Sequence, residues 1–215
     1  MKGLALMIVD MQKYYLESNS VYSRYFNYLY PGSLSYIIDR SYKVVIPNIK
    51  RVKEFFRANN LPVIYLRLCG TDPERKDLHR FFKKSYEDGC AKGYIGVYPL
   101  ETDIYADVID DLKPDTDDII INKTTFSPFA STEIDNILKS MKITSIAFSG
   151  LATSQCVETT ARNASDKGYK VYHLHDAQAD YDEIIHEASL YCSRGVCGGD
   201  IFDTVSFIKF IREFI

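Results

Sequence analysis

Short runs of consecutive apolar residues recur along the chain, separated by segments in which apolar residues return every three or four positions. The runs are rich in β-branched and aliphatic residues, which is typical of strands buried on both faces of a sheet. They lie at residues 4–9, 62–68, 118–121, 143–149, 170–174 and 202–207. The pattern therefore predicts six short strands.

The segments between these runs have the period of amphipathic helices. They lie at residues 44–59, 132–141, 155–167 and 181–191. In the first of them Val45, Ile49, Val52 and Phe56 fall on one face. Strands that alternate with helices predict an α/β fold of three layers, in which a parallel sheet lies between two layers of helices as in Rossmann-like domains.

Two long connections do not fit this alternation. Residues 14–40 include eight aromatic residues without a clear period, and residues 69–98 mix charges, aromatics and glycines. Long connections in compact domains often cover a functional site. We expect both to shape a pocket or an interface between subunits.

Composition narrows the class of protein further. A chain of 215 residues with 46% hydrophobic positions is predicted to form one domain, residues 1–215. Its net charge of −3 and its scattered Lys and Arg residues predict no nucleic-acid partner. The first apolar run stops at Asp10 after too few residues for a signal peptide or a membrane span, so no membrane partner is expected either.

The cysteines indicate a reducing compartment. There are five, Cys69, Cys90, Cys156, Cys192 and Cys197, an odd number without any CxxC pair. This pattern suits neither a disulfide framework nor a zinc site. We therefore expect a cytoplasmic protein.

Three residues with reactive side chains fall at predicted strand ends, where ligands bind in open parallel sheets. Asp10 ends the first strand and can accept a proton, and Lys123 follows the third and can hold that carboxylate ionised. Cys156 follows the fourth strand in the first turn of a helix, where the helix dipole favours a thiolate. Taken singly, they also fit a cap, a solvated lysine and a buried cysteine, so the hypothesis depends on the three together.

Three motifs strengthen the hypothesis of a reactive set made by Asp10, Lys123 and Cys156. They are I-V-D-M-Q at residues 8–12, K-T-T-F-S-P-F-A-S-T at residues 123–132 and S-G-L-A-T-S-Q-C-V-E-T-T-A at residues 149–161. With them the chain resembles the isochorismatase-like cysteine hydrolases from about Leu4 to Phe207. The resemblance implies a catalytic set of Cys156, Asp10 and Lys123 on a six-stranded parallel sheet. It also implies a homo-oligomer, a dimer or a tetramer.

By the same resemblance, the peptide bond between Leu151 and Ala152 is expected to be cis, and the N–H groups of Ala152 and Cys156 are expected to form an oxyanion hole. The implied reaction is hydrolysis of a small amide or ureido compound through a thioester on Cys156. A non-catalytic binding or scaffold protein on this fold remains an alternative, because fold does not fix function.

Positions at which this sequence differs from members of the family restrict the kinds of substrate and cofactor that we expect. The nicotinamidases of the family carry an Asp-x-His metal motif after the second strand, and residues 67–79 here lack it. His173 and His175 lack a third ligand at useful spacing, so no metal and no other cofactor are expected. The isochorismatases that cleave an ether usually lack the cysteine, which favours amide or ureido chemistry. Nicotinamidase-type and isochorismatase-type hydrolases stay as alternatives.

Four further residues are candidates for substrate binding. Arg67 can clamp a carboxylate or form an ion pair with a nearby acid. Gln12 and Gln178 can bind an amide or urea group, or instead make ordinary hydrogen bonds to the backbone. Phe126 can form an apolar wall of the pocket or belong to the core.

Overall fold

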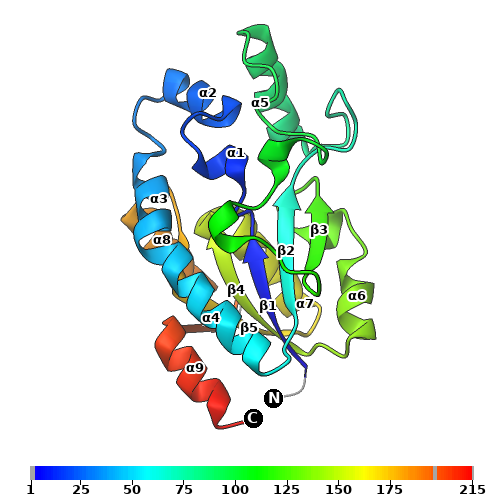
Figure 1. The fold of residues 1–215 in the computed structure, drawn as a ribbon, viewed down its shortest axis with the longest axis vertical. Coiled ribbons are helices and arrows are strands. Elements are labelled where there is room, and N and C mark those ends of the chain that lie inside the picture. Colours follow the sequence, from blue (N-terminus) through cyan, green and yellow to red (C-terminus); the bar gives the residue numbers. More distant parts are fainter. Residues whose placement is uncertain (1–2, 196–197, 215) are drawn as a thin grey trace.

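The computed structural model describes residues 3–195 and 198–214, and six parallel strands within them form one sheet (Figure 1). The strands are β1 (Leu4–Val9), β2 (Val63–Leu68), β3 (Ile119–Lys123), β4 (Ser145–Leu151), β5 (Lys170–Ala179) and β6 (Asp200–Phe202). Their order in space is β3-β2-β1-β4-β5-β6, so the direction of winding reverses between β1 and β4. The predicted parallel sheet is confirmed.

Both faces of the sheet are largely apolar, and the central strand β1 carries an apolar residue at every position. In β1 the side chains of Leu4, Leu6 and Ile8 join one core cluster, and the residues that alternate with them join the other. Helices α4 (Ile46–Ala58) and α9 (Thr204–Arg212) pack on the first face. Helices α6 (Ile134–Ser140) and α7 (Glu158–Asp166) pack on the second, which confirms the three-layer α/β/α fold.

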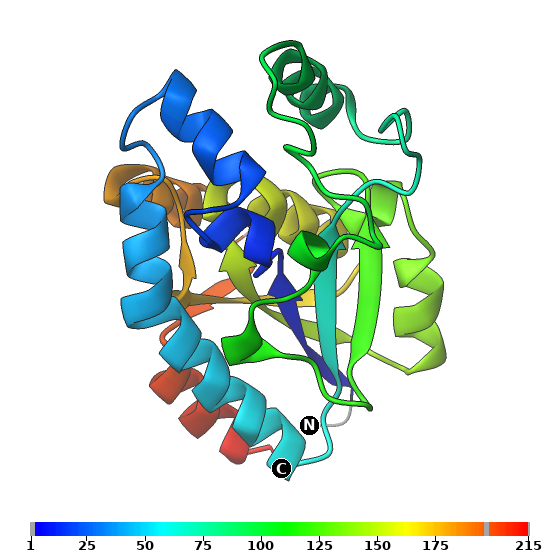
Figure 2. The same cartoon turned by 45° about the horizontal axis from the view of Figure 1, so that its top comes forward.

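The remaining helices gather mainly near the ends of the sheet. They are α1 (Lys13–Leu16), α2 (Val21–Leu29), α3 (Ser35–Arg40), α5 (Arg80–Ala91) and α8 (Glu183–Ser193). π-helical turns η1 (Ser41–Val45) and η5 (Thr153–Val157) lead into α4 and α7, and short 3₁₀ turns occur at Ile104–Ala106, Asp110–Leu112 and Pro128–Ala130. Figures 1 and 2 show α1, α2 and α5 beyond the arrowheads of the central strands, so both long connections return over the carboxyl edge of the sheet.

One predicted strand is wrong over most of its length. Residues 202–207 were expected to form a strand because they are rich in aromatic and β-branched residues, but the strand ends at Phe202 and α9 begins at Thr204. The Asp203 carboxylate accepts the N–H of Ser206 and so caps the helix. Phe207 and Ile211 then bury at helical spacing against α4 and β5. The cap and the tertiary packing together outweigh the strand propensity of this segment.

Candidate active site

The three candidate catalytic residues meet at the carboxyl edge of the sheet. Asp10 directly follows β1, and Cys156 lies in η5 after the neighbouring strand β4. Lys123 is the last residue of β3, two strands from β1, and its long side chain reaches across β2. The site thus lies at the point where the winding of the sheet reverses, which is where open parallel sheets bind ligands.

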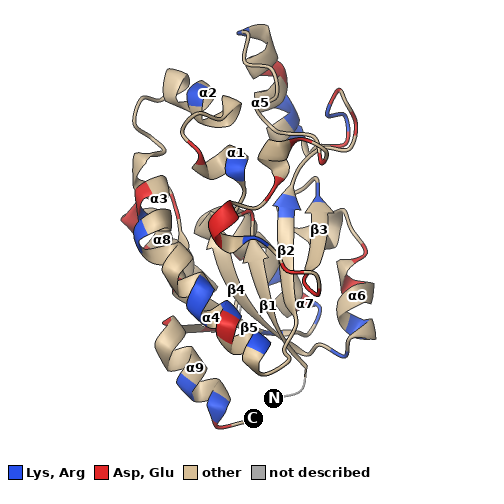
Figure 3. Cartoon of the chain, in the orientation of Figure 1, with Lys and Arg blue, Asp and Glu red and all other residues tan. Residues whose placement is uncertain are grey.

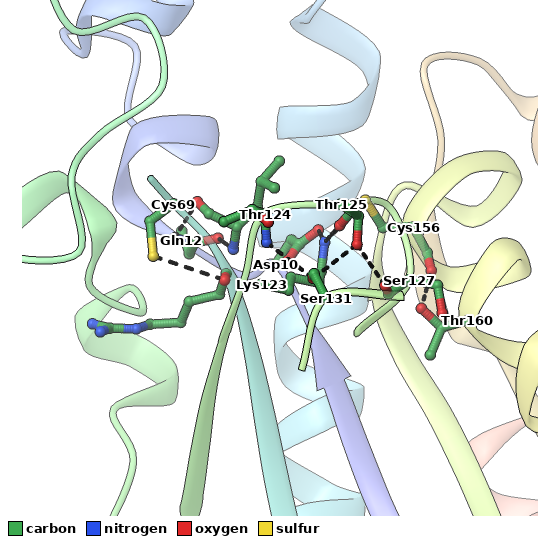
Figure 4. A network of polar contacts seen from close by, with 12 residues as sticks. Asp10, Gln12, Cys69, Lys123, Thr124, Thr125, Ser127, Ser131, Cys156 and Thr160 are labelled. Atoms are coloured by element: carbon green, nitrogen blue, oxygen red, sulfur yellow. Dashed lines mark hydrogen bonds and ion pairs between the residues drawn. The ribbon is translucent and has the colours of Figure 1, made fainter. Parts of the chain in front are cut away.

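We call Asp10, Lys123 and Cys156 the polar centre, because the Lys123 ammonium contacts both other side chains (Figure 4). Its Nζ lies 2.9 Å from Oδ2 of Asp10 and 3.4 Å from Sγ of Cys156, and it also donates to the Thr125 carbonyl at 3.1 Å. The exposed fractions are 0% for Lys123, 3% for Asp10 and 5% for Cys156. Oδ1 of Asp10 has no hydrogen-bond partner among the described residues, so it is available to accept a proton.

Burial and mutual contact decide the protonation of these groups. Burial raises the pKa of the Asp10 carboxyl, although the Lys123 ammonium acts against that shift. Burial and then the Asp10 carboxylate raise the pKa of the Cys156 thiol far above its ordinary value. Burial acts to lower the pKa of Lys123, but Asp10 and Cys156 outweigh it and the net shift is upward. The resting centre therefore holds a thiol beside an ammonium, and a base must take the thiol proton before attack.

The start of a helix favours a thiolate at Cys156, but burial and the Asp10 carboxylate act in the opposite direction and raise the pKa of the thiol. The partial charge of a helix terminus is small, and here it competes with complete burial and with a carboxylate neighbour. The thiolate forms only when the proton is removed during reaction.

The backbone of the two central strand ends is specialised. Asp10 has φ of 51°, in the left-handed region that few residues other than glycine adopt. Gly150 has φ of 104°, and a Cβ atom there would lie 2.1 Å from the Val9 carbonyl oxygen. Only glycine lets β4 approach β1 this closely. That approach brings the segment ending at Cys156 next to Asp10.

Two buried side chains hold the turn that carries Cys156. The Asp180 carboxylate accepts the N–H of Ser154 at 2.6 Å, and a ring nitrogen of His186 lies 2.8 Å from the Thr153 hydroxyl. Burial, and then Arg40, lower the pKa of His186 to about 4, so its ring is neutral near pH 7. The sequence indicated neither contact, because Asp180 and His186 come from the end of β5 and from α8, far along the chain.

The predicted cis peptide bond between Leu151 and Ala152 is wrong for this structure, since no cis peptide bond occurs among the described residues. A trans bond is favoured by about 3 kcal/mol for residues other than proline. The oxyanion donors Ala152 and Cys156 stay a prediction. The Ala152 carbonyl accepts the N–H groups of Gln155 and Val157, and the N–H of Cys156 between them is not among its donors.

A small cavity of about 40 Å³ lies against the polar centre and is lined by Asp10, Cys156 and Gln155 together with many aromatic side chains. We call the aromatic ones the aromatic cover. Its members are Tyr14, Tyr15, Tyr22, Phe26, Phe81, Phe82, Tyr98 and Tyr181. The cavity is roughly a quarter of the ~150 Å³ cavity that holds benzene in another protein. A substrate of that size therefore requires movement of the cover.

Most of the aromatic cover comes from the two long connections, as expected. Its rings pack mainly edge to face. The centroid of the Tyr22 ring lies 5.2 Å from that of Tyr14 and 5.6 Å from that of Tyr98. The hydroxyl groups of Tyr15 and Tyr181 are 2.8 Å apart. The helical positions of Tyr14 and Tyr22 were not predicted, because the periodicity of this region is weak.

Gln12 and Arg67 do not line the cavity. The fully buried Gln12 amide donates to the carbonyls of Leu68 and Ala106 and accepts the N–H of Leu68 at 2.7 Å. Arg67 donates to Asn122 and pairs with Asp107, each at 2.9 Å. The structure therefore favours the backbone and ion-pair roles of these residues over substrate binding.

Gln178 and Phe126 do not line the cavity either. Gln178 is fully buried and donates to the Phe148 carbonyl at 2.9 Å. Phe126 packs on Phe82 with ring centroids 4.5 Å apart, so it supports a lining residue without lining the cavity itself. The structure therefore favours the backbone role for Gln178 and the core role for Phe126, both of which the sequence had left open.

Among residues 3–195 and 198–214, no three or more His, Cys, Asp or Glu side chains are grouped to hold a metal ion. Within the same residues, no helix has both the length and the apolar character needed to cross a bilayer. In the view of Figure 3, residues of both charge signs are interspersed along the helices. Cys197 lies outside the described residues.

Comparison with known proteins agrees with this architecture. Residues 4–198 match the family model described as the Isochorismatase domain, so the chain belongs to the isochorismatase family. It is a hydrolase of that family, which confirms the resemblance seen in the motifs.

Similar proteins include amidohydrolases. Ureidoacrylate amidohydrolase RutB of Acinetobacter baylyi is 29% identical over 214 residues, covering 95% of this chain and 82% of that protein. A cysteine hydrolase from Pseudomonas syringae pv. phaseolicola superposes with a TM-score of 0.78 at 25% identity, over 99% of this chain and 94% of the other. N-carbamoylsarcosine amidase from Thermoplasma acidophilum shares the fold, with a TM-score of 0.70 at 22% identity over 95% and 97% of the two chains.

Proposed function

We propose that this protein is a cysteine amidohydrolase that cleaves the C–N bond of a small amide or ureido compound through a thioester on Cys156. The observation that carries the proposal is the position of the buried Lys123 ammonium, within hydrogen-bonding distance of both the Asp10 carboxylate and the Cys156 sulfur. A buried lysine, carboxylate and thiol in contact are costly for stability, which suggests a catalytic purpose.

In the first half-reaction Asp10 accepts the proton of the Cys156 thiol. The thiolate attacks the substrate carbonyl carbon, a C–S bond forms, and the π electrons of the carbonyl move to its oxygen. Lys123 stabilises the negative charge on both sulfur and carboxylate as the proton moves, because its Nζ contacts both groups. The N–H groups of Ala152 and Cys156 are the proposed donors to the oxyanion.

The second half-reaction releases both products. Protonated Asp10 returns its proton to the nitrogen, the C–N bond breaks, and ammonia or an amine leaves the thioester behind. Asp10 then takes a proton from water, the hydroxide attacks the thioester, and the C–S bond breaks. Asp10 finally returns the proton to the Cys156 sulfur, which restores the thiol.

The class of substrate is proposed from the relatives and from the nucleophile. Ureidoacrylate amidohydrolase and N-carbamoylsarcosine amidase both carry names that specify C–N cleavage. A cysteine nucleophile suits acyl transfer from an amide carbonyl, since the thioester is readily hydrolysed. We propose that no metal takes part and that the chain works as a cytoplasmic homo-oligomer.

The test measures ammonia released from nicotinamide, N-carbamoylsarcosine, ureidoacrylate, biuret and maleamate. The wild-type protein is expected to release ammonia from at least one of them with EDTA present. Cys156→Ala is expected to lower kcat/KM by about 10⁴-fold or more, because the nucleophile is absent. Its matched control is Cys90→Ala, which alters a partly buried cysteine of α5 that does not line the cavity.

Loss of activity with EDTA would contradict the metal-free mechanism and favour a nicotinamidase-type site. Silence across the whole panel, together with a Cys156 that iodoacetamide does not alkylate, would favour the scaffold alternative.

A further inference from the structure

The cavity beside the polar centre has an unusual distribution of charge. Among the described residues that line it, Asp10 is the one with a formally charged side chain, and its charge is negative. The others are aromatic or apolar apart from Cys156 and the amide of Gln155. No lysine or arginine of the described chain lines the cavity.

Three basic side chains that contact Asp10, contact a lining residue or precede one in the chain are engaged in other interactions. Lys123 contacts Asp10, the Thr125 carbonyl and the Cys156 sulfur and is fully buried. Arg67 pairs with Asp107, and Arg75 donates to the carbonyls of Tyr98 and Pro73. Among the residues that line the cavity, a substrate carboxylate therefore meets no cation.

One N–H group at the start of the nucleophile turn is already engaged by a carboxylate. Backbone N–H groups at such a position often bind anions. Here the N–H of Ser154 already donates to the Asp180 carboxylate, at 2.6 Å. Asp180 is fully buried, so a second negative charge stands close to the Cys156 turn in addition to that of Asp10.

The aromatic cover supplies polarity without charge. The Tyr14, Tyr22 and Tyr98 side chains are buried around the cavity, and burial raises the pKa of each hydroxyl well above its ordinary value. These hydroxyl groups therefore stay neutral near pH 7. Neutral hydroxyls and ring faces suit an uncharged polar or apolar group better than a carboxylate, whose desolvation they compensate weakly.

We propose that the site selects substrates whose non-reacting part carries no carboxylate, so that the preferred substrate is a small uncharged amide or ureido compound. The inference rests on the proposed function and narrows it. It separates this chain from any enzyme whose substrate is held by a charge-assisted bond to a carboxylate. The specificity arises from the neutral aromatic cover and from the fact that Lys123, Arg67 and Arg75 are held in other contacts.

The first test compares two small alkylating reagents of nearly equal size on the wild-type protein. Iodoacetamide is neutral and iodoacetate is an anion. In both reactions the Cys156 sulfur forms a bond to carbon, iodide leaves, and the thiol proton is released. The exposed Cys192 in the same molecule and free glutathione serve as reference thiols. Peptide mass spectrometry gives the rate at each cysteine.

The ratio of the iodoacetamide rate to the iodoacetate rate at Cys156 is expected to exceed the ratio at both reference thiols by at least about tenfold, because the anion enters an uncompensated site. An equal or smaller ratio at Cys156 would overturn the inference and leave the proposed function standing. A Cys156 that reacts with neither reagent would instead contradict the proposed function, so the two failures are distinguishable.

A second test places a cation in the cavity wall. Gln155 lines the cavity and is partly exposed, so Gln155→Arg adds a positive charge where a longer side chain can reach solvent. The Gln155→Arg variant is expected to lower the ratio of the iodoacetamide rate to the iodoacetate rate at Cys156 several-fold. It is also expected to raise kcat/KM for succinamate, an anion, relative to its uncharged isostere levulinamide. The neutral control Gln155→Met should keep the wild-type ratio. Equal ratios in the two variants would count against a role for charge.

Discussion

The polar centre and the aromatic cover face each other across the same cavity but are built by different means. The polar centre takes its residues from the ends of β1, β3 and the turn after β4, so sheet register fixes their positions. The aromatic cover takes its residues from α1, α2, α5 and neighbouring segments, whose positions follow from ring packing. The polar centre is charged and rigidly placed, whereas the cover is uncharged and depends on contacts between helices.

This contrast assigns different tasks to the two regions. Changes in the polar centre should alter the chemical step or leave a buried charge without its partner. Changes in the cover should alter substrate affinity and the stability of the closed cavity, with little effect on proton transfer. The four predictions below test this division, from the largest expected effect to the smallest.

Replacing the proposed base should have the largest effect. Asp10→Asn is expected to lower kcat by about 10³-fold, because the amide cannot take the thiol proton. In the wild type, kcat/KM should fall as the pH falls through the pKa of Asp10, since the base must be ionised. Because burial raises that pKa, the acid limb should lie above the ordinary value near 4.

The control for this change is Asp107→Asn, which breaks the Arg67 ion pair outside the cavity. It is expected to leave kcat within about threefold of the wild type, because the Asp107 carboxylate is exposed and lies outside the cavity. A comparable loss in both variants would mean that Asp10 acts on the fold and not as the base.

Removing the central ammonium should cost stability as well as activity. Lys123→Met is expected to lower the free energy of unfolding by about 3–5 kcal/mol near pH 7, because it leaves the Asp10 carboxylate buried without its partner. Urea denaturation measures this loss, which should shrink at acid pH as Asp10 becomes protonated. Lys139→Met, at an exposed pair with Asp135, should change stability by no more than about 0.5 kcal/mol. A stable variant that retains full activity would argue against the role of Lys123.

The contact between His186 and the nucleophile turn gives a pH dependence. The folded pKa of His186 is about 4, below the unfolded value near 6.5, so the unfolded state binds more protons between these values. His186 thus lowers the free energy of unfolding by up to about 3 kcal/mol as the pH falls from 6.5 to 4. His186→Gln should remove this part of the slope, as followed by thermal unfolding. Parallel curves for the two proteins would contradict it.

The smallest effect is expected in the cover. Tyr15→Phe removes the hydroxyl contact with Tyr181 and should lower the free energy of unfolding by about 1 kcal/mol. KM should rise a few-fold while kcat stays near the wild-type value, because no group of the polar centre changes. Tyr30→Phe, on an exposed tyrosine, is the matched control and should alter neither quantity. A large fall in kcat for Tyr15→Phe would contradict the proposal that only the polar centre acts in the chemical step.

Long-range packing explains why the sequence-based interpretation of some residues had to remain open. Gln12, Arg67 and Gln178 all follow or lie within strands, which made each a candidate for substrate binding. Which partner each one finds depends on residues such as Ala106, Asp107 and Phe148. Those partners are distant along the chain, and strand-end position alone does not reveal whether a polar side chain turns toward the cavity or toward the backbone.

The sequence by itself determined the alternation of the first five strands with the helices at residues 44–59, 132–141, 155–167 and 181–191. With it came the carboxyl edge at which Asp10, Lys123 and Cys156 meet. Continuous apolar runs can be satisfied only inside a covered parallel sheet, and parallel strands bring their carboxyl ends to one edge. Tertiary structure alone decided three features: the small cavity without a lining cation, the contacts of Asp180 and His186 with the nucleophile turn, and the helix that begins at Thr204. Each of these depends on which distant side chains are buried together, and burial is a property of the packed chain rather than of any local pattern.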